Sequence, residues 1–339
     1  MQLINTTFAV GTETNMVEIT DVRKSYGNKH AVNGISFEVK DGEIFGFLGP
    51  NGAGKSTTLN IITGYLSADS GSVKIDGTDI LAEPLKAKKD IGFLPEIPPL
   101  YVEMTVLEYL NFVYDLKGCK LPRKQHLKEI CEVVKIWDVG NRLIKNLSKG
   151  YRQRVGIAQA LIGNPKVLIF DEPTIGLDPR QIIEIRNLIK MLGREHTIIL
   201  STHILPEVQA VCDRIVVINK GEIVANEKTE DLINAVDGSR KLVAKIVGPE
   251  EEVLKALRSL GGVKTAEVLG KRDTDSISYM IESQERVDIR KPLFALLSGR
   301  NWPLIGLEGM ELSLEDIFMR LVGKEKDKDN GKKAKKGVK

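Results

Sequence analysis

The chain has 339 residues, of which 42% are hydrophobic and 28% charged, which is the composition of an ordinary soluble protein with room for two domains. No stretch approaches the roughly 18 to 20 consecutive apolar residues that cross a bilayer. The first residues, MQLINTTFAVGTETN, also lack the basic start and long apolar stretch of a signal peptide. We therefore expect a protein that stays in the cytosol.

The net charge of +3 arises in the C-terminal tail, residues 323–339, where eight lysines face three acidic residues. Such a lysine-rich tail is typical of a solvated, disordered end of a chain. A weak contact with anionic lipid or with nucleic acid is the alternative interpretation.

The three cysteines of the chain are Cys119, Cys131 and Cys212. They lie far apart and lack the CxxC spacing of a zinc site. Their odd number also argues against a disulfide framework. We expect reduced thiols whose only role is packing.

The N-terminal part predicts a phosphate-binding loop. From residue 16 the pattern indicates two strands, and a third strand over residues 43–49 runs into a helix over residues 55–66. Between them lies GPNGAGKST, which fits the pattern G-x-x-x-x-G-K-[ST]. Glycines let backbone N–H groups close around phosphate oxygens, Lys55 reaches the β and γ phosphates, and the Ser56 hydroxyl is a ligand for Mg²⁺.

The middle of the chain, about residues 85–165, predicts helices. Thr105 is placed to cap one helix, and Pro122 suits the first turn of the next. A third helix begins at Ser148, after which apolar residues recur with helical spacing. Because a helix start offers bare N–H groups to an anion, the chain contains a second candidate phosphate site.

Strands return at residues 166–170 and 197–202, with a helix from about Pro179 between them, which predicts a parallel sheet wrapped by helices. Asp171 and Glu172 follow the first of these strands, at the edge where a parallel sheet presents side chains to a ligand. We expect Asp171 to hold Mg²⁺, directly or through water. Glu172 is expected to orient or deprotonate the attacking water.

His203 follows the second of these strands, in the segment LSTH. A lone histidine at a strand end is more often structural than catalytic, so the pattern alone predicts no catalytic role for it. The other histidines, His30, His126 and His196, have no such setting and are expected to be structural.

After about residue 238 the pattern shortens to the order βαββαβ, which suggests a ferredoxin-like sandwich. The expected strands are residues 240–247, 262–269, 276–283 and 303–309, and the expected helices are residues 249–260 and 285–298. A last helix, LSLEDIFMRLVG, precedes the tail.

The motifs and their order resemble those of the ATP-binding subunits of ABC transporters. The five segments are SYG at 25–27, GPNGAGKST at 49–57, LSKGYRQRVGIAQAL at 147–161, VLIFDEPTIGLDP at 167–179 and STH at 201–203. The resemblance implies an α/β fold, in which an ABC-type P-loop ATPase domain has a parallel sheet core, an antiparallel β subdomain and a helical subdomain. A small α+β ferredoxin-like C-terminal domain follows it.

This resemblance divides the chain into four parts. They are an N-terminal extension (1–15), the ATP-binding domain (16–237), the C-terminal domain (238–322) and the basic disordered tail (323–339). We expect the ATP-binding domain to contain every residue that contacts ATP.

By the same resemblance the chain binds ATP and Mg²⁺ and hydrolyses ATP. Tyr26 would stack on adenine, and Asp178 would lie in the loop that links two active sites. His203 would contact the γ-phosphate, which replaces the structural interpretation of that histidine. The phosphates would be held by nine consecutive residues, Gly49, Pro50, Asn51, Gly52, Ala53, Gly54, Lys55, Ser56 and Thr57.

The resemblance also accounts for the second anion site. In the family, two subunits close head to tail, so Ser148 and the N–H groups near Gly150 would contact the γ-phosphate of the ATP that the other subunit holds. ATP would hold the dimer together, and hydrolysis would release it. A P-loop kinase is a third possible class of protein, but it would have no use for the segment that begins at Ser148. The sequence leaves open whether the second subunit is identical or different.

Two positions depart from the pattern of the family. The usual signature LSGGQ is here LSKGY, residues 147–151, which keeps the serine and the second glycine, and we expect a working site. Glu96 stands where the family has a glutamine that meets Mg²⁺ and the water, so it adds a negative charge near the metal. Glu96 is thus a candidate catalytic and metal-binding residue, and it either tightens metal binding or slows hydrolysis.

An ATP-binding subunit without spanning segments needs a polytopic membrane permease to transport anything. The resemblance therefore implies a position at the cytoplasmic face of the cell membrane. In the family, the segment that is here Ile97–Thr105 and the adjoining helices receive this partner; an ordinary packed loop is the alternative.

The C-terminal extension looks like that of bacterial type-2 exporter subunits of the gliding-motility and multidrug-export kinds, which implies a function in export. Soluble ABC ATPases acting on ribosomes or DNA form the alternative class. The second cassette or the long coiled coil that such proteins carry is missing from the sequence, and no nucleic-acid partner is expected.

Overall fold

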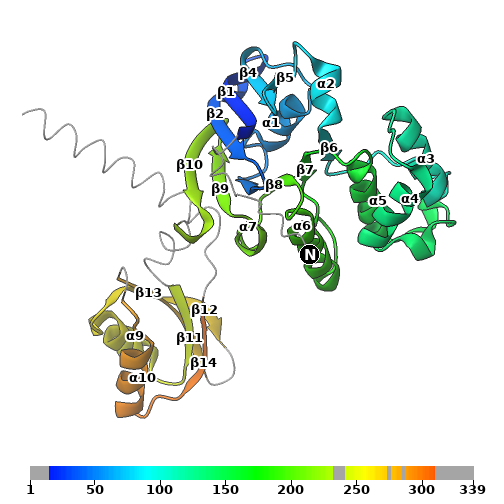
Figure 1. The fold of residues 1–339 in the computed structure, drawn as a ribbon. Helices are drawn as coiled ribbons and strands as arrows, with labels where there is room; N and C mark the ends of the chain where they lie inside the picture. The colour runs from blue at the N-terminus through cyan, green and yellow to red at the C-terminus, as the bar shows by residue number, and fades with distance from the viewer. Residues whose placement is uncertain (1–14, 232–240, 273–275, 285–286, 310–339) are drawn as a thin grey trace, which may run out of the picture. The chain divides into compact units, whose positions relative to one another are not determined.

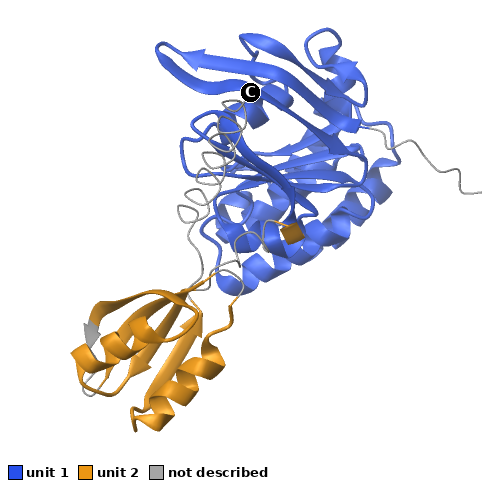
Figure 2. Cartoon of the chain, turned by 90° about the vertical axis from the view of Figure 1, so that its left-hand side faces the viewer, with its two compact units in different colours: residues 1–229 blue, residues 230–339 orange. Residues whose placement is uncertain are grey.

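The computed structural model describes residues 15–231, 241–272, 276–284 and 287–309 (Figure 1). The expected N-terminal extension up to residue 14, the last predicted helix and the basic tail lie outside the described residues. The chain divides into two compact units, Met1–Thr229 and Glu230–Lys339, which Figure 2 shows in different colours. Each unit has a hydrophobic core of its own.

A six-stranded sheet in the order β10-β9-β3-β8-β7-β6 forms the centre of the first unit. Its strands are β3 (Ile44–Leu48), β6 (Ile91–Leu94), β7 (Val167–Asp171), β8 (Thr197–Thr202), β9 (Arg214–Asn219) and β10 (Glu222–Lys228). Neighbouring strands are parallel except for β10 and β9. The prediction of a parallel sheet is thus confirmed, and β3, β7 and β8 are buried along their whole length.

Strand β6 lies inside the section that the sequence predicted as helical. Its four residues, IGFL, pair in parallel with β7. A short run that is apolar throughout cannot be separated from a buried helix segment by its hydrophobic pattern, because it shows neither the alternation of a half-buried strand nor the spacing of an amphipathic helix.

A four-stranded antiparallel sheet in the order β2-β1-β4-β5 packs against one face of the central sheet. Its strands are β1 (Asn15–Tyr26), β2 (Lys29–Lys40), β4 (Ser70–Ile75) and β5 (Thr78–Asp79). Phe37 of β2 stacks on Phe45 and Phe47 of β3, with ring centroids 5.2 and 5.6 Å apart. Helix α1 (Lys55–Ile62) contributes buried residues to the same core, so this packing holds the start of α1 beside β3.

Helices α6 (Pro179–Leu192) and α7 (Leu205–Val211) belong to the other side of the central sheet. Gly46 of β3 lets α7 approach closely: a Cβ at this position would lie 3.0 Å from Val208 Cγ1 and 3.1 Å from Cys212 Sγ. The close approach places the first turn of α7 next to the end of β8.

A group of helices lies beyond β6 (Figure 1). It contains α3 (Val106–Leu116), α4 (Arg123–Val133) and α5 (Lys149–Leu161), and a short helix α2 (Pro84–Lys89) precedes β6. Thr105 and Ser148 are the N-cap residues of α3 and α5, as the sequence predicts, whereas Pro122, which was predicted in the first turn of α4, is the N-cap residue directly before it. Helix α5 packs on β6 and so joins this group to the sheet.

Over its described residues between 241 and 309, the second unit consists of an antiparallel sheet and the helices α9 and α10. Its elements are β11 (Lys241–Ile246), α9 (Glu250–Ser259), β12 (Val263–Arg272), β13 (Ile277–Ser283), α10 (Arg290–Gly299) and β14 (Leu304–Gly309). The strand order is β12-β13-β11-β14 and every pair is antiparallel. The element order βαββαβ and this pairing are those of a ferredoxin-like fold. Helix α10 begins at Arg290, later than the predicted residue 285.

No helix among the described residues is long and apolar enough to cross a membrane. Cys119, Cys131 and Cys212 form no disulfide. Burial raises the pKa of the Cys131 thiol to about 11 and also raises the pKa of the Cys212 thiol. Both buried thiols are therefore protonated at neutral pH, as expected for packing residues.

Candidate functional site

Three neighbouring strands bring the predicted site residues to one edge of the central sheet. The phosphate loop follows β3, Glu172 follows β7, and His203 follows β8, and in the sheet β8 lies between the other two. Because the three strands are parallel, their carboxyl ends meet at the same edge. Residues that are more than a hundred positions apart in the sequence thus become neighbours.

The phosphate loop requires glycine at two positions for steric reasons. A Cβ at Gly49 would lie 2.5 Å from the Ile218 carbonyl oxygen. Gly54, the N-cap of α1, has a φ of 112°, and a Cβ there would lie 2.4 Å from the Ala31 carbonyl oxygen. Only glycine fits both places without a backbone shift. The loop can therefore wrap its N–H groups closely around an anion.

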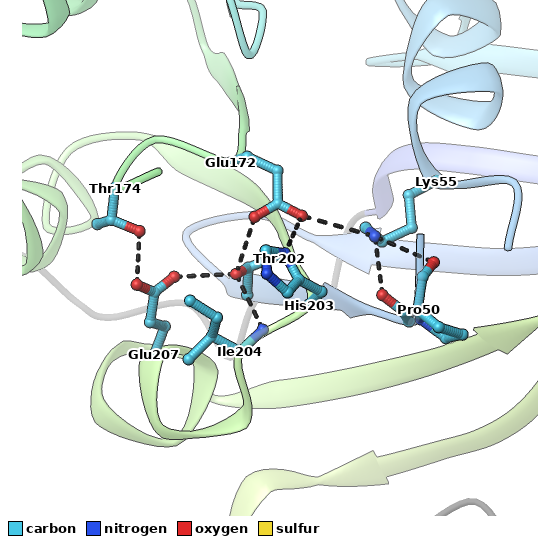
Figure 3. A network of polar contacts seen from close by, with 9 residues as sticks. Pro50, Lys55, Glu172, Thr174, Thr202, His203, Ile204 and Glu207 are labelled. Atoms are coloured by element: carbon cyan, nitrogen blue, oxygen red, sulfur yellow. Dashed lines mark hydrogen bonds and ion pairs between the residues drawn. The ribbon is translucent and has the colours of Figure 1, made fainter. Parts of the chain in front are cut away.

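Lys55 is buried at the base of this loop and is 5% exposed. Its ammonium group donates to the carbonyl oxygens of Gly49, at 2.7 Å, and of Pro50, at 3.3 Å. The same group lies 3.6 Å from Oε1 of Glu172. The lysine thus places a positive charge between the loop and the acidic end of β7 (Figure 3).

Glu172 is the centre of a network of polar contacts (Figure 3). It is 5% exposed, and its Oε1 lies 2.9 Å from Nδ1 of His203. Its Oε2 lies 3.2 Å from the hydroxyl oxygen of Thr202. The residue has a φ of 49°, a left-handed conformation that costs a non-glycine residue free energy and persists only where surrounding contacts hold it.

A cavity of about 380 Å³ opens between the phosphate loop and these side chains. Its lining includes most of the loop together with Tyr26, Glu96, Glu172 and His203. Tyr26 is 52% exposed, so one face of its ring is available to a flat ligand at the mouth of the cavity. The structure therefore brings the predicted adenine, phosphate and water-activating positions into one space.

Asp171 and Ser56 fit a magnesium ion. Asp171 is 4% exposed, and its Oδ1 is a buried oxygen without a hydrogen-bond partner among the described residues. Ser56 is exposed in the cavity. Mg²⁺ is usually held by one or two carboxylates together with substrate phosphates, so an orphaned carboxylate oxygen at the end of β7 matches its needs, although Asp171 does not line the cavity described above. The described residues contain no group of three or more His, Cys, Asp or Glu side chains that would enclose a metal by themselves.

The second anion site lies elsewhere in the unit. Ser148 caps α5, and its hydroxyl oxygen accepts a bond from the Tyr151 N–H at 3.4 Å. Gly150 is buried. A Cβ at this position would lie 2.6 Å from Cδ of Gln181. Neither Ser148 nor Gly150 lines the cavity described above. Asp178 is likewise outside it, and its carboxylate caps α6 by accepting from the Gln181 N–H at 2.9 Å.

The sequence missed several residues that the structure places at the site. Lys29 and Ile175 line the cavity, and Thr174, Thr202 and Glu207 form the polar network next to it. The sequence could have indicated Thr202, because it is a polar residue at the end of an apolar strand. Glu207 lies five residues after Thr202, but no pattern in the sequence indicates its contact with Thr174, which is 33 residues earlier.

A lysine-bearing phosphate loop opposite a buried glutamate, at the carboxyl edge of a parallel sheet, defines a P-loop nucleoside triphosphatase. The family model described as ABC transporter matches residues 32–175. The linearmycin resistance ATP-binding protein LnrL of Bacillus subtilis (strain 168) is 34% identical over 311 residues, which cover 91% of this chain and 99% of that protein. The Nod factor export ATP-binding protein I of Rhizobium etli is 35% identical over 316 residues, which cover 92% and 95%.

A solved structure with a similar fold is the ATP-binding cassette MJ0796 in a dimeric, post-hydrolysis state bound to ADP and Pi. It is 30% identical, has a TM-score of 0.58, and the match covers 63% of this chain and 99% of that one. The chain belongs to the family of ABC transporter ATP-binding proteins. It is the ATP-binding and ATP-hydrolysing subunit of such a transporter.

Proposed function

We propose that this subunit binds ATP with Mg²⁺ in the cavity, closes on it as a head-to-tail dimer, and drives export through a membrane permease. The observation that carries the proposal is the division of the predicted ATP contacts. Lys55, Glu172 and His203 meet in one cavity, whereas the capped start of α5 lies outside it. A second copy or a related subunit is needed to bring that helix start to the nucleotide.

Lys55 and the loop N–H groups hold the phosphates in this proposal. The Lys55 ammonium, now on two loop carbonyls, turns to the β and γ oxygens, where its charge is better compensated. Tyr26 stacks on the base at the mouth of the cavity. Because Lys55 is 5% exposed, its ammonium interacts more strongly with the phosphate charge than it would in bulk water.

Glu172 and His203 act on the attacking water. Glu172 accepts a hydrogen bond from the water, orients it toward the γ-phosphorus and accepts its proton. His203, whose Nδ1 lies 2.9 Å from Glu172 Oε1, holds that carboxylate in place and turns its other ring nitrogen toward the γ-phosphate. The water is then aligned with the bond that breaks between the β and γ phosphates.

Asp171 and Ser56 would hold the magnesium ion, and Glu96 lines the same cavity as Ser56. Mg²⁺ supplies neutralisation of the charge on the β and γ phosphates. Glu96 adds a second carboxylate, so we expect tight metal binding at this site.

Ser148, Gly150 and Asp178 act across the dimer. The N-terminus of α5 carries bare N–H groups and the positive end of the helix dipole, both of which favour a γ-phosphate held by the other subunit. Asp178 starts α6 at the end of the loop that begins with Glu172, so it is suited to carry a change at one active site toward the other. Loss of the γ-phosphate by hydrolysis removes the attraction and opens the dimer.

Export is supported by the names of the relatives, which include a linearmycin resistance protein and Nod factor export proteins. None of these names favours the alternative of a soluble ATPase acting on ribosomes or DNA. The permease would hold the subunit at the cytoplasmic face of the membrane.

A groove of about 470 Å³ in the first unit suits the permease. Aromatic residues from α3 and the segment before it line the groove, and Tyr101 packs edge-on against Tyr109 and Phe112 with ring centroids 6.0 and 5.3 Å apart. Leu116 is 73% exposed and Ile97 is 82% exposed. An ordinary packed loop would bury such residues, so they favour a docking surface for an apolar helix of the partner.

The decisive experiment uses the Glu172→Gln variant. It removes the proton acceptor and keeps the shape of the side chain, so we expect ATP to bind and hydrolysis to fall by about 100-fold or more. The variant with ATP and Mg²⁺ should accumulate as a dimer in size-exclusion chromatography with light scattering, whereas the wild type with ADP should not. Wild-type hydrolysis by the variant would remove Glu172 from its role, and a monomer with bound ATP would argue against the dimer.

Docking is tested by purifying the tagged Glu172→Gln chain with ATP from mildly solubilised membranes. We expect a polytopic membrane protein in stoichiometric amount. The change Leu116→Glu should abolish its recovery while leaving ATP binding intact, because a charge in an apolar contact must be desolvated. The matched control is Leu85→Glu on α2, where an 81% exposed leucine lies outside the groove. Recovery of ribosomes or DNA in place of a membrane protein would support the soluble class.

A further inference from the structure

Glu207, in the first turn of α7, is 2% exposed and does not line the cavity. Its carboxylate accepts two hydrogen bonds from hydroxyl groups, one from Thr174 at 2.5 Å and one from Thr202 at 2.9 Å (Figure 3). Thr174 stands two residues after Glu172, and Thr202 directly precedes His203. The single carboxylate of Glu207 thus connects the two segments that carry the water-activating pair.

The hydroxyl of Thr202 lies between two carboxylates. Its oxygen is 2.9 Å from Oε2 of Glu207 and 3.2 Å from Oε2 of Glu172, and it accepts the N–H of Ile204 at 3.2 Å. A hydroxyl has only one proton to donate, so it serves one carboxylate at a time. The shorter distance favours Glu207, and Oε2 of Glu172 is then left without this donor.

We propose that Glu207 is a positioning residue for ATP hydrolysis. By accepting the Thr202 proton, it keeps one oxygen of Glu172 available to the attacking water. By accepting the Thr174 hydroxyl, it also holds the loop that follows the left-handed backbone of Glu172, whose φ is 49°. This inference rests on the proposed role of Glu172.

Arg186 determines how the amide of a glutamine at position 207 would be oriented. Its Nη2 lies 3.9 Å from Oε1 of Glu207, the oxygen that also accepts from Thr174. In a Glu207→Gln variant the positive guanidinium favours the carbonyl oxygen on its own side, and the amide NH₂ therefore faces Thr202. The NH₂ group donates to the Thr202 oxygen, and the Thr202 proton turns to Glu172.

The Glu207→Gln variant should therefore bind ATP as the wild type does but hydrolyse it more slowly. We expect kcat to fall by about 10- to 100-fold, as for a misplaced catalytic group, with an unchanged Kd for ATP. Thermal unfolding reports whether the variant is folded. Glu132→Gln, at an exposed glutamate of α4, is the control for the substitution itself.

The double variant Glu207→Gln with Thr202→Val separates positioning from a general structural role. Valine keeps the shape of threonine but has no proton to redirect, so we expect it to restore part of the kcat lost in Glu207→Gln. If Glu207 had only a structural role, the kcat loss of the double variant would instead be the product of the losses measured for Glu207→Gln alone and for Thr202→Val alone. Multiplied losses, or a wild-type kcat in Glu207→Gln, would overturn the inference. Failure of the proposed function is a different result, since it would appear as normal turnover by Glu172→Gln.

Discussion

At the scale of single residues, the site depends on charges that are buried and paired. Lys55 and Glu172 are both 5% exposed, lie 3.6 Å apart, and each has further hydrogen-bond partners. Removing one member of such a pair leaves an uncompensated buried charge, which costs more than the pair contributes. The two residues therefore stabilise one another as well as facing the cavity.

Gly54, at the start of α1, is required by close backbone packing. The Gly54→Ala change should lower the free energy of unfolding by about 2 kcal/mol or more, because it combines a φ of 112° with a Cβ that would lie 2.4 Å from a carbonyl oxygen. Urea unfolding measures this loss. ATP binding should fall with it, since the loop shifts.

Gly42→Ala is the matched control for this prediction. Gly42 has a φ of 71°, but no atom lies within 4 Å of an added Cβ. We expect only the strain of the left-handed backbone, about 1 to 2 kcal/mol, and normal ATP binding. Equal losses of stability in the two variants would show that the carbonyl contact at Gly54 is unimportant.

At the scale of elements, helix α3 shows how local sequence determines an end. Thr105 and Glu108 form a capping box: the Glu108 N–H donates to the threonine hydroxyl at 3.3 Å, and the Glu108 carboxylate accepts the Thr105 N–H at 2.8 Å. These bonds satisfy N–H groups that have no partner inside the helix. The helix that carries aromatic residues of the groove beside Tyr101 thus has a defined first turn.

The capping box makes a prediction about pH. Hydrogen bonds from the Thr105 N–H, and then from its hydroxyl, hold the pKa of Glu108 below its ordinary value of 4.5. A lowered pKa in the folded state means that the ionised cap stabilises the protein above pH 4.5 and that this contribution is lost as the pH falls through the folded pKa. Glu108→Gln should therefore be less stable than the wild type at neutral pH, with a difference that narrows below pH 4.5 in urea unfolding. A difference that is constant with pH would contradict the charged cap.

At the scale of the whole molecule, the nucleotide cavity belongs to one of the two compact units. The residues that line the nucleotide cavity lie between Tyr26 and His203, all in the first unit. The second unit has its own core, in which Leu242, Tyr279 and Leu293 are buried. ATP binding should therefore not depend on the second unit.

A chain truncated after residue 231 tests this independence. We expect it to bind a fluorescent ATP analogue with the affinity of the full chain, because every residue of the cavity is present. Lys55→Ala in the same truncated chain is the control for non-specific binding. Loss of binding by a truncated chain that is still folded would show that the second unit contributes to the site.

The sequence by itself determined the phosphate loop, the Asp171–Glu172 pair, the caps of α3 and α5 and the order of strands and helices along the second unit. Each of these features depends on residues that are neighbours along the chain. Examples are a glycine pattern, a polar pair after an apolar run, and a hydroxyl oxygen that accepts the N–H of the third residue after it. Local chemistry is sufficient in such cases.

Only the tertiary structure decided which distant residues meet. Strand β6 was missed because its four residues are a continuous apolar run without alternation, and its identity depends on pairing with β7. Glu207 was missed because its carboxylate meets Thr174, which lies 33 residues earlier in the sequence, only when the segments after β7 and β8 come together in the fold. Contacts between elements depend on how the sheet and helices pack, and no pattern within a single segment records that.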